Sequence, residues 1–211
     1  MCGAYGDAEN GAGSLMHNLV LATHNDGKAR EISALLKPYV QEFYTAKTLN
    51  IPEPEETEDS FIGNALLKAR HACAFTGKPA LSDDSGLCVN ALDGAPGIYS
   101  ARWAYADGSD VRDFDYAMKR VWDALSEHQD KSAYFVCALA LVTPDGTEHV
   151  FEGYVHGTLL YPPRGDKGFG YDPIFLPKGH DITFGEMNPA DKHAMSHRAD
   201  AFAKLVDGVF S

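Results

Sequence analysis

Runs of apolar residues along this chain alternate with stretches in which apolar residues recur every three or four positions. The run at 19–22 is typical of a buried strand, and the spacing from Ala29 to Leu36 predicts a helix that ends before Pro38. The same reasoning predicts further strands at 41–45, 79–81, 133–142, 148–155 and 171–176, and helices at 61–75, 111–125 and 190–209. We interpret this order of strands and helices as that of an α/β protein.

Turn and capping residues mark the ends of several of these elements. A Pro-Asp-Gly sequence at 144–146 predicts a turn that joins the last two long strands into a hairpin. The helix that begins near Phe61 has Asp59 or Ser60 as its N-cap, and it ends at Gly77.

Length and composition are typical of one compact, enzyme-sized unit. With 211 residues, of which 45% are hydrophobic, the chain can bury a substantial core in one domain or in one domain with two lobes. Its 18 Lys and Arg residues against 30 Asp and Glu residues leave a net charge of −12, which argues against a protein that coats nucleic acid. We therefore expect no nucleic-acid partner.

The sequence lacks recognisable secretion and membrane signals and has no CxxC spacing, and we therefore expect a cytoplasmic protein. No apolar run approaches the roughly 20 residues needed to cross a bilayer, so we expect no membrane partner. The first residues lack a basic start followed by an apolar core, and we interpret 1–17 as a flexible extension before a single domain at 18–211. The cysteines have no CxxC spacing and are interpreted as reduced thiols: Cys2, Cys73, Cys88 and Cys137.

Two adjacent carboxylates, Asp83 and Asp84, directly follow the apolar run at 79–81. Side chains at the carboxyl end of a strand in an α/β protein face the crevice where ligands bind. Burying two neighbouring carboxylates is costly unless a cation or several hydrogen bonds compensate them. The pair therefore indicates a metal site or proton chemistry, with a plain polar turn as the alternative.

The loop at 23–28 precedes the first predicted helix, where free backbone N–H groups and the positive end of the helix dipole face the crevice. The Thr23 hydroxyl, the Asn25 amide and the Lys28 ammonium could hold a phosphate there. The segment is not a Walker loop, because Ala29 stands where a magnesium-binding Ser or Thr is required. An ordinary capped helix with a surface lysine is the alternative.

Two further segments could bind a charged ligand. Glu56 lies upstream of a helix on which Asn64 and Lys68 are four residues apart, so an anion-binding lysine could lie beside a carboxylate metal ligand. The alternative is that both charges are simply exposed. The Gly-Phe-Gly-Tyr-Asp-Pro segment at 168–173 combines flexible backbone, two aromatic faces and a carboxylate, which favours stacking of a base and hydrogen bonding to its edge or to a sugar.

Three cationic or hydrogen-bonding side chains follow near the start of the last predicted helix. Lys192, His197 and Arg198 would suit the carbonyl oxygens of a purine, because arginine can bond both O6 and N7 of a keto purine. His193 and His197 have the spacing of a zinc pair, but Ala194 stands where the HExxH motif requires glutamate. We therefore do not expect zinc.

Taken in order, these motifs resemble the inosine/xanthosine triphosphate pyrophosphatase family. The segments that carry the resemblance are ATHNDGKAREI, EETEDSFIGNALLKARHA, LSDDSGL, GAPGIYSARWA, GFGYDPIF and MSHRADAF. Each is weak alone, whereas the combination, which covers 19–205, is highly specific. The resemblance implies a magnesium-dependent homodimer that hydrolyses ITP, dITP and XTP to the nucleoside monophosphate and pyrophosphate. It also implies an elongated mixed β-sheet with flanking helices and two lobes around a central cleft.

The resemblance further implies a role for each motif. The triphosphate would be contacted by Thr23, His24, Asn25, Asp26, Gly27, Lys28 and Lys68. Glu56 and Asp84 would hold Mg²⁺. Asp84 would also accept the proton, with Asp83 beside it and Ser85 binding the substrate. The base and sugar pocket would be formed by Phe169, Gly170, Tyr171, Asp172, Lys192, His197 and Arg198.

One position departs from the family pattern, and three other functions are possible. Gly63 stands where many relatives have glutamate, and a glycine inside a helix costs about 1 kcal/mol relative to alanine, which affects the expected helix start. A septum-inhibitor-type pyrophosphatase for modified pyrimidine triphosphates fits the SHR and GFGYD segments less well. An aspartyl-phosphate phosphatase would need a DxDxT spacing that 83–86 lacks. A non-enzymatic nucleotide sensor would not need the intact set of carboxylates.

Overall fold

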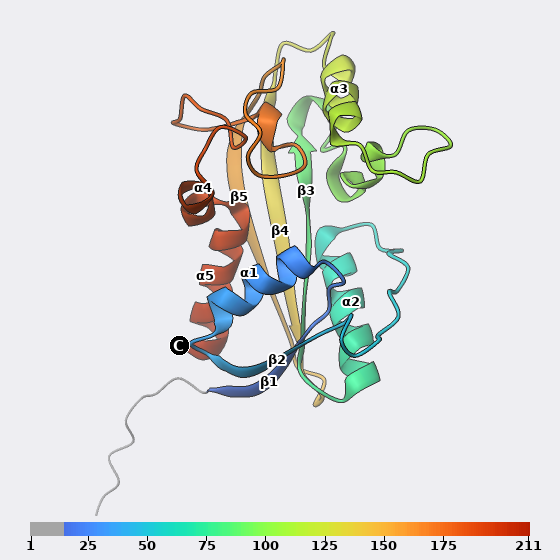
Figure 1. Ribbon diagram of the computed structural model, residues 1–211, viewed down its shortest axis with the longest axis vertical. Coiled ribbons are helices and arrows are strands. Elements are labelled where there is room, and N and C mark those ends of the chain that lie inside the picture. Colours follow the sequence, from blue (N-terminus) through green and yellow to red (C-terminus); the bar gives the residue numbers. More distant parts are fainter. Residues whose placement is uncertain (1–14) are drawn as a thin grey trace, which may run out of the picture.

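The structure is a computed structural model that describes residues 15–211, and a six-stranded sheet runs along its longest axis (Figure 1). The strands are β1 (Met16–Leu21), β2 (Val40–Thr45), β3 (Ala80–Val89), β4 (Ser132–Val142), β5 (Glu148–Leu159) and β6 (Phe175–Pro177). The helices are α1 (Asp26–Leu36), α2 (Phe61–Thr76), α3 (Phe114–Ala124), α4 (Pro189–Met195) and α5 (His197–Phe210). The expected elongated α/β architecture is confirmed.

The sheet is mixed, with the order β2-β1-β3-β4-β5-β6. β1 is parallel to β2 and β3, whereas β3 to β6 are antiparallel, and β4 and β5 form the predicted hairpin. β1 pairs with β3 only at Ala80 and Leu81. Beyond Leu81, β3 continues beside β4 alone, so the edge that β1 leaves open lies next to Asp83 and Asp84.

This extent of β3 corrects the expected strand at 79–81. Asp83 and Asp84 pair with Leu139 and Ala138 of β4, and the strand continues to Val89. The pairing with β4 supplies backbone hydrogen bonds that apolar patterning does not reveal, so polar residues continue the strand. The two carboxylates therefore lie within a central strand rather than in a turn after it.

Helices cover both faces of the sheet, and the side chains of β4 show which helices lie on which face. Leu139 and Leu141 of β4 pack in one cluster with α1 and α5. Ala138 and Ala140, which point the other way, pack in a second cluster with α2. One lobe therefore consists of β1, β2, α1, α2, α5 and the adjoining parts of β3 to β5 (Figure 1).

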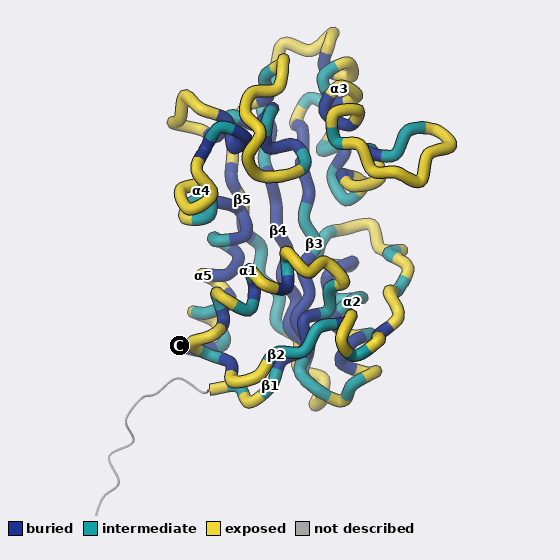
Figure 2. Tube along the Cα trace, viewed as in Figure 1, coloured by how far each residue is buried: buried dark blue, intermediate teal, exposed yellow. Residues whose placement is uncertain are grey.

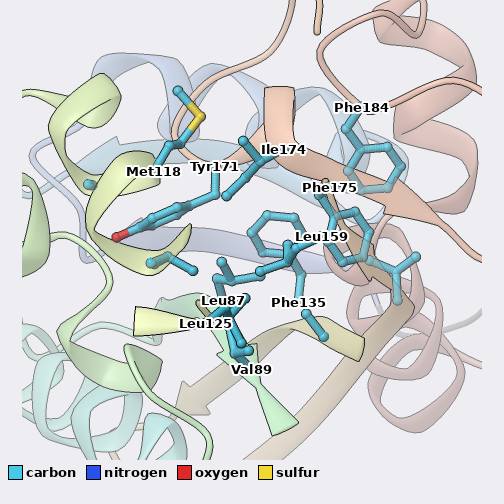
Figure 3. Close-up of a cluster of buried hydrophobic side chains, with 14 of the residues drawn as sticks. Leu87, Val89, Met118, Leu125, Phe135, Leu159, Tyr171, Ile174, Phe175 and Phe184 are labelled. Atoms are coloured by element: carbon cyan, nitrogen blue, oxygen red, sulfur yellow. The ribbon is translucent and has the colours of Figure 1, made fainter. Parts of the chain in front are cut away.

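A third cluster forms the core of the other lobe, which contains α3, β6 and the far ends of the long strands (Figure 3). Phe135 and Phe175 lie at its centre, and Met118 of α3 and Tyr171 pack beside them. β3 and β4, which are mostly buried, and β5, which is mostly half-buried or exposed, pass through both lobes and join them (Figure 2). The lobes therefore share one continuous sheet.

Capping side chains set several helix boundaries as expected. Ser60 Oγ accepts a hydrogen bond from Gly63 N at 3.0 Å, so α2 begins at Phe61 despite the glycine. Gly77 ends α2 with φ +64°. α3 begins at Phe114 rather than at 111, because the Asp113 side chain caps it.

Two expectations near the C-terminus need correction. The single helix expected at 190–209 is two helices, because the extended backbone of Ser196 separates α4 from α5 and its hydroxyl caps α5 through Ala199 N. The strand expected at 171–176 begins only at Phe175, after a 3-10 turn at Asp172–Ile174. In both places a side chain or a turn binds the backbone hydrogen-bonding groups. The helix or strand that the sequence pattern predicts is therefore interrupted there.

Several expectations concern the ends and thiols of the chain. Of the expected extension at 1–17, residues 1–14 lie outside the described part, whereas β1 already begins at Met16. Within the described residues, every helix is too short or too polar to cross a membrane. Cys73, Cys88 and Cys137 are buried free thiols, as expected, and Cys2 lies outside the described part.

Candidate functional site

A cavity of about 630 Å³ lies in the cleft between the two lobes. It is lined by the start of α1, by α4 and α5, by β3, by Ser100 and Ala101 between two 3-10 turns, and by the start of α3. The expected residues that line it are Asn25, Gly27, Lys28, Ser85, Phe169, Gly170, Tyr171, Asp172, Lys192 and His197. The cavity thus gathers sequence motifs that lie more than 160 residues apart.

Asp83 is buried on the face of the sheet that α1 and α5 cover. Its Oδ2 atom lies 2.8 Å from Lys28 Nζ and 3.5 Å from Arg198 Nη2. Burial alone would raise the pKa of Asp83, but the charges of Lys28, Arg198 and Lys68 outweigh it and hold this pKa well below its usual range. Asp83 therefore stays ionised and anchors two cations at the floor of the cleft.

Asp84 lies on the opposite face, towards α2. Its Oδ1 atom is 3.6 Å from Lys68 Nζ, while its buried Oδ2 atom has no hydrogen-bond partner within the described part of the chain. Burial is the main cause that raises the pKa of Asp84 to about 6, and the neighbouring carboxylates of Glu56 and Asp83 add to it against the pull of Lys68. Such a carboxylate can accept a proton near neutral pH.

Glu56 reaches the same cation from the segment before α2. Lys68 Nζ lies 2.7 Å from Glu56 Oε1, so Glu56 and Asp84 share one ammonium group. The described residues show no cluster of three or more His, Cys, Asp or Glu side chains that could hold a metal. Mg²⁺ commonly binds through one or two carboxylates together with substrate phosphates and water, so Glu56 and the free oxygen of Asp84 fit this ion.

The loop at 23–28 builds the start of α1 and directs Lys28 into the site. Asn25 Oδ1 accepts hydrogen bonds from Gly27 N at 2.9 Å and Lys28 N at 3.1 Å, and Thr23 Oγ1 accepts one from Asn25 N. A Cβ atom on Gly27 would lie 3.1 Å from this cap oxygen, so the tight turn favours glycine. The loop is therefore an ordinary helix cap, and at the same time it places Lys28 where it could contact a phosphate.

Two other residues of this loop point away from Lys28. His24 Nε2 lies 2.8 Å from the carbonyl oxygen of Ile51, beside the segment that leads to α2. Asp26 forms an exposed ion pair with Lys47 at 2.7 Å. Neither side chain lines the main cavity.

The loop at 168–172 presents one aromatic ring to solvent at the cavity. Phe169 is 61% exposed, and its backbone N–H donates to Asp172 Oδ2 at 2.8 Å. Lys192 pairs with the same carboxylate and lies 4.8 Å from the centre of the Phe169 ring. Burial raises the pKa of Asp172 against the opposing effect of Lys192. An exposed ring held by such a network is available for stacking.

Tyr171 was expected to offer its ring to a base, but most of its contacts are with the protein itself. It is buried, its hydroxyl donates to the carbonyl oxygen of Ser100 at 2.7 Å, and its ring meets Phe114 edge to face with centroids 5.6 Å apart. The ring still lines the cavity wall. Of the two aromatic faces in the motif, Phe169 is therefore the free one.

His197 and Arg198 are buried at the start of α5. The His197 ring stacks on Phe135 with centroids 5.1 Å apart, and its Nδ1 atom has no hydrogen-bond partner among the residues that the structure describes. Burial, followed by the charges of Arg198 and Lys192, lowers the pKa of His197 well below its ordinary value, so the ring is neutral. Arg198 contacts Asp83 and also lies 3.6 Å from Glu31, which uses part of its hydrogen-bonding capacity within the protein.

The cavity also contains residues that the sequence reasoning missed. They are Glu31, Gly86, Leu87, Ser100, Ala101, Arg112, Phe114 and Phe135. Glu31 could have been found, because it lies three residues from Lys28 on the same helix face. Ser100 and Ala101 lie inside the GAPGIYSARWA segment, which carried no individual role.

Comparison with known proteins places the chain in a family. The sequence model of the Ham1 family matches residues 19–208. A dITP/XTP pyrophosphatase from Rhodospirillum centenum is 57% identical over 92% of this chain and 95% of the relative. One from Caulobacter vibrioides is 59% identical over 91% of this chain and 97% of the relative.

Solved structures show the same fold. A HAM1 protein from Coxiella burnetii superposes with a TM-score of 0.84 at 38% identity, covering 92% of this chain and 98% of that protein. A nucleoside-triphosphatase / dITP/XTP pyrophosphatase from Mycobacterium abscessus has a TM-score of 0.74 at 40% identity, covering 90% and 98%. The chain therefore belongs to the Ham1 family.

Proposed function

We propose that this protein hydrolyses the non-standard purine triphosphates ITP, dITP and XTP to the nucleoside monophosphate and pyrophosphate, and so removes deaminated purines from the nucleotide pool. The relatives from Rhodospirillum centenum and Caulobacter vibrioides carry the name dITP/XTP pyrophosphatase. The observation that carries the proposal is Asp84, a half-buried carboxylate with a pKa of about 6 that shares Lys68 with Glu56 and whose buried Oδ2 atom has no hydrogen-bond partner among residues 15–211. This is an arrangement for proton transfer next to a phosphate chain.

The cations of the cleft explain how a polyanion can bind to an acidic protein. A triphosphate carries about four negative charges, and the chain has a net charge of −12, so binding needs local neutralisation. Lys28 and Lys68 lie on the two sides of β3, next to Asp83 and Asp84. Both lysines would contact the phosphates, and Thr23, Asn25 and Gly27 would shape the turn that presents Lys28.

Asp84 is the residue that we assign as the proton acceptor. It would take a proton from a water molecule that attacks the α-phosphorus, so that pyrophosphate leaves. Asp83, whose pKa lies well below its usual range, would remain charged and orient Lys28 and Arg198. When bound by Glu56 and Asp84, Mg²⁺ would neutralise phosphate charge. Ser85, the next residue of β3, lines the cavity and would contact the substrate.

The base pocket would consist of Phe169 and the donors around it. The exposed Phe169 ring would stack on the purine, as aromatic side chains do with bases. Lys192, His197 and Arg198 would face the carbonyl at position 6 of hypoxanthine or xanthine. Adenine presents an amino group there, so a donor of the protein would oppose another donor, which costs roughly 1–3 kcal/mol. His24, Asp26, Gly170, Tyr171 and Asp172 would support the loops around the nucleotide.

A panel of nucleotides assayed with Mg²⁺ tests the proposal. Release of pyrophosphate from ITP, dITP and XTP in preference to ATP and GTP is the expected result. Orthophosphate as the first product would instead identify a phosphatase, and binding without turnover would identify a sensor. Preference for modified pyrimidine triphosphates would favour the septum-inhibitor type.

We also propose that the protein is a cytoplasmic homodimer. The buried free thiols of Cys73, Cys88 and Cys137 are consistent with a reducing compartment. Light scattering coupled to size-exclusion chromatography should give twice the chain mass of 22.9 kDa. A mass of one chain at micromolar concentration would contradict the dimer.

A further inference from the structure

Glu56, which we propose as a metal ligand, lies before α2 in a segment without helix or strand. Residues 46–60 connect β2 to α2 and contain neither helix nor strand. No strand pairing therefore holds Glu56 in place, and its position depends on side-chain contacts. From its own lobe, Lys68 binds the carboxylate oxygen Oε1 at 2.7 Å. A second contact reaches Glu56 from the other lobe.

That second contact comes from Arg102, the first residue of the 3-10 turn Arg102–Ala104. Its Nη2 atom donates a hydrogen bond to the carbonyl oxygen of Glu56 at 3.1 Å. Its guanidinium lies over the Tyr99 ring, 5.1 Å from the centroid, which orients the side chain. Within residues 15–211, no carboxylate lies within 4.0 Å of the Arg102 guanidinium. Its charge is therefore not held elsewhere by an ion pair.

The backbone that carries Arg102 is fixed against β3, the strand of Asp84. Ser100 Oγ accepts a hydrogen bond from Leu87 N at 2.9 Å and donates one to Gly97 O at 2.6 Å. A Cβ atom on Gly86 would lie only 2.4 Å from Gly97 O, so glycine permits this close approach. Tyr171 adds a hydrogen bond from its hydroxyl to Ser100 O at 2.7 Å. The segment 97–102 is thus tied to β3 at one end and to Glu56 at the other.

We propose that Arg102 is a positioning residue that holds Glu56 at the separation from Asp84 that Mg²⁺ needs. The inference rests on the proposed function, because it takes Glu56 and Asp84 as the metal ligands. Arg102 would act through the backbone of Glu56 and would not touch the metal. In Figure 1 the segment around 97–104 lies above the loop before α2. The hydrogen bond from Arg102 to the carbonyl oxygen of Glu56 joins these two segments.

The variant Arg102→Ala tests this role by its dependence on Mg²⁺. The Mg²⁺ concentration for half-maximal ITP hydrolysis should rise about tenfold, the size expected for loss of a residue that orients a metal ligand. The kcat at saturating Mg²⁺ should stay within about threefold, since the ligands themselves remain. Arg120→Ala is the matched control, because Arg120 is an exposed arginine of the same lobe that stacks on Trp103 and does not line the cavity. It should leave both quantities unchanged.

A readout without turnover is hydrogen exchange of residues 53–59 in the protein free of nucleotide and metal. Exchange in this segment should be faster in Arg102→Ala than in the wild type or in Arg120→Ala, with thermal unfolding temperatures alike. An unchanged exchange rate, or an unchanged Mg²⁺ requirement, would overturn the inference.

A double-mutant cycle with Glu56→Gln separates this inference from the proposed function. Glu56→Gln alone should raise the Mg²⁺ requirement, and adding Arg102→Ala should then change it little, because without the carboxylate the position of residue 56 no longer affects metal binding. Effects that multiply in the double variant would show that Arg102 does not act through Glu56. If Glu56→Gln alone left the Mg²⁺ requirement unchanged, the metal assignment in the proposed function would fail, whatever Arg102 does.

Discussion

Asp83 and Asp84 are consecutive residues of β3, yet their carboxylates lie on opposite faces of the sheet. Asp83 Oδ2 is 2.8 Å from Lys28 of α1, and Asp84 Oδ1 is 3.6 Å from Lys68 of α2. Alternation along a strand is the cause. The same dipeptide therefore contains one carboxylate with a lowered pKa and one with a raised pKa, and the two can be given separate tasks.

Asp84→Asn should abolish most turnover while it stabilises the fold. The amide cannot accept the proton, so we expect the rate of pyrophosphate release from ITP to fall at least about a thousandfold. Because the pKa of Asp84 is about 6, this group is mostly ionised at pH 7.5 without metal, and its charge is then less stable in the folded protein than in the unfolded chain. The neutral amide should raise the free energy of unfolding by about 1–3 kcal/mol, measured by denaturant titration without Mg²⁺. Near-normal hydrolysis would refute the assignment.

Asp83→Asn should instead destabilise the protein. It removes the counter-charge of Lys28 and of the buried Arg198, and breaking such a pair typically costs about 3 kcal/mol. The same denaturant titration at pH 7.5 measures the effect, and Asp84→Asn serves as the isosteric control one residue away. Equal changes of the same sign in the two variants would contradict the separate environments of the two carboxylates.

The titration of Asp84 should be visible in stability as a function of pH. Its folded pKa of about 6 lies above the unfolded value of 3.8, so between these values the folded protein binds more protons than the unfolded chain. Its contribution to stability should therefore fall as pH rises from about 4 to 6, and stay level above. The difference in unfolding free energy between the wild type and Asp84→Asn, measured without metal, isolates this contribution. If the difference in unfolding free energy between the two proteins did not change between about pH 4 and 6, the raised pKa of Asp84 would be contradicted.

Phe169→Ala should weaken substrate binding with little effect on stability. The ring is 61% exposed, so its removal costs little burial, whereas base stacking on an aromatic side chain contributes about 1–3 kcal/mol. We expect KM for ITP to rise roughly fivefold to a hundredfold. Tyr116→Ala removes a partly exposed ring of α3 and is the control. An unchanged KM in Phe169→Ala would remove stacking from the base pocket.

His197→Phe should reduce the preference for ITP over ATP. Phenylalanine retains the stack on Phe135 but removes the nitrogen Nδ1, which has no hydrogen-bond partner in the range 15–211. Losing one hydrogen bond to the purine edge should lower the ratio of kcat/KM for ITP and ATP about tenfold. Because the ring is neutral, the wild-type ratio should not change between pH 6 and 8. A ratio that is the same in variant and wild type would assign selectivity to other donors.

Local patterns in the sequence were sufficient for most elements and for the family. The helical spacing before Pro38, the N-cap Ser60 with the glycine stop at Gly77, and the Pro-Asp-Gly hairpin turn are all confirmed. These features depend on interactions between residues close in the chain, so the sequence determines them without knowledge of the fold. The ordered series of motifs likewise indicated the inosine/xanthosine triphosphate pyrophosphatase family, and the Ham1 family model matches 19–208.

Only the tertiary structure decided what each motif faces. Pairing with β4 extends β3 through Asp83 and Asp84, and the end of β1 at Leu21 opens the edge beside them. The burial and the charges that shift their pKa values come from Lys28, Lys68 and Arg198, which are distant in sequence. Electrostatic shifts depend on distances across the fold and on loss of water, and neither quantity is encoded in the spacing of residues along the chain.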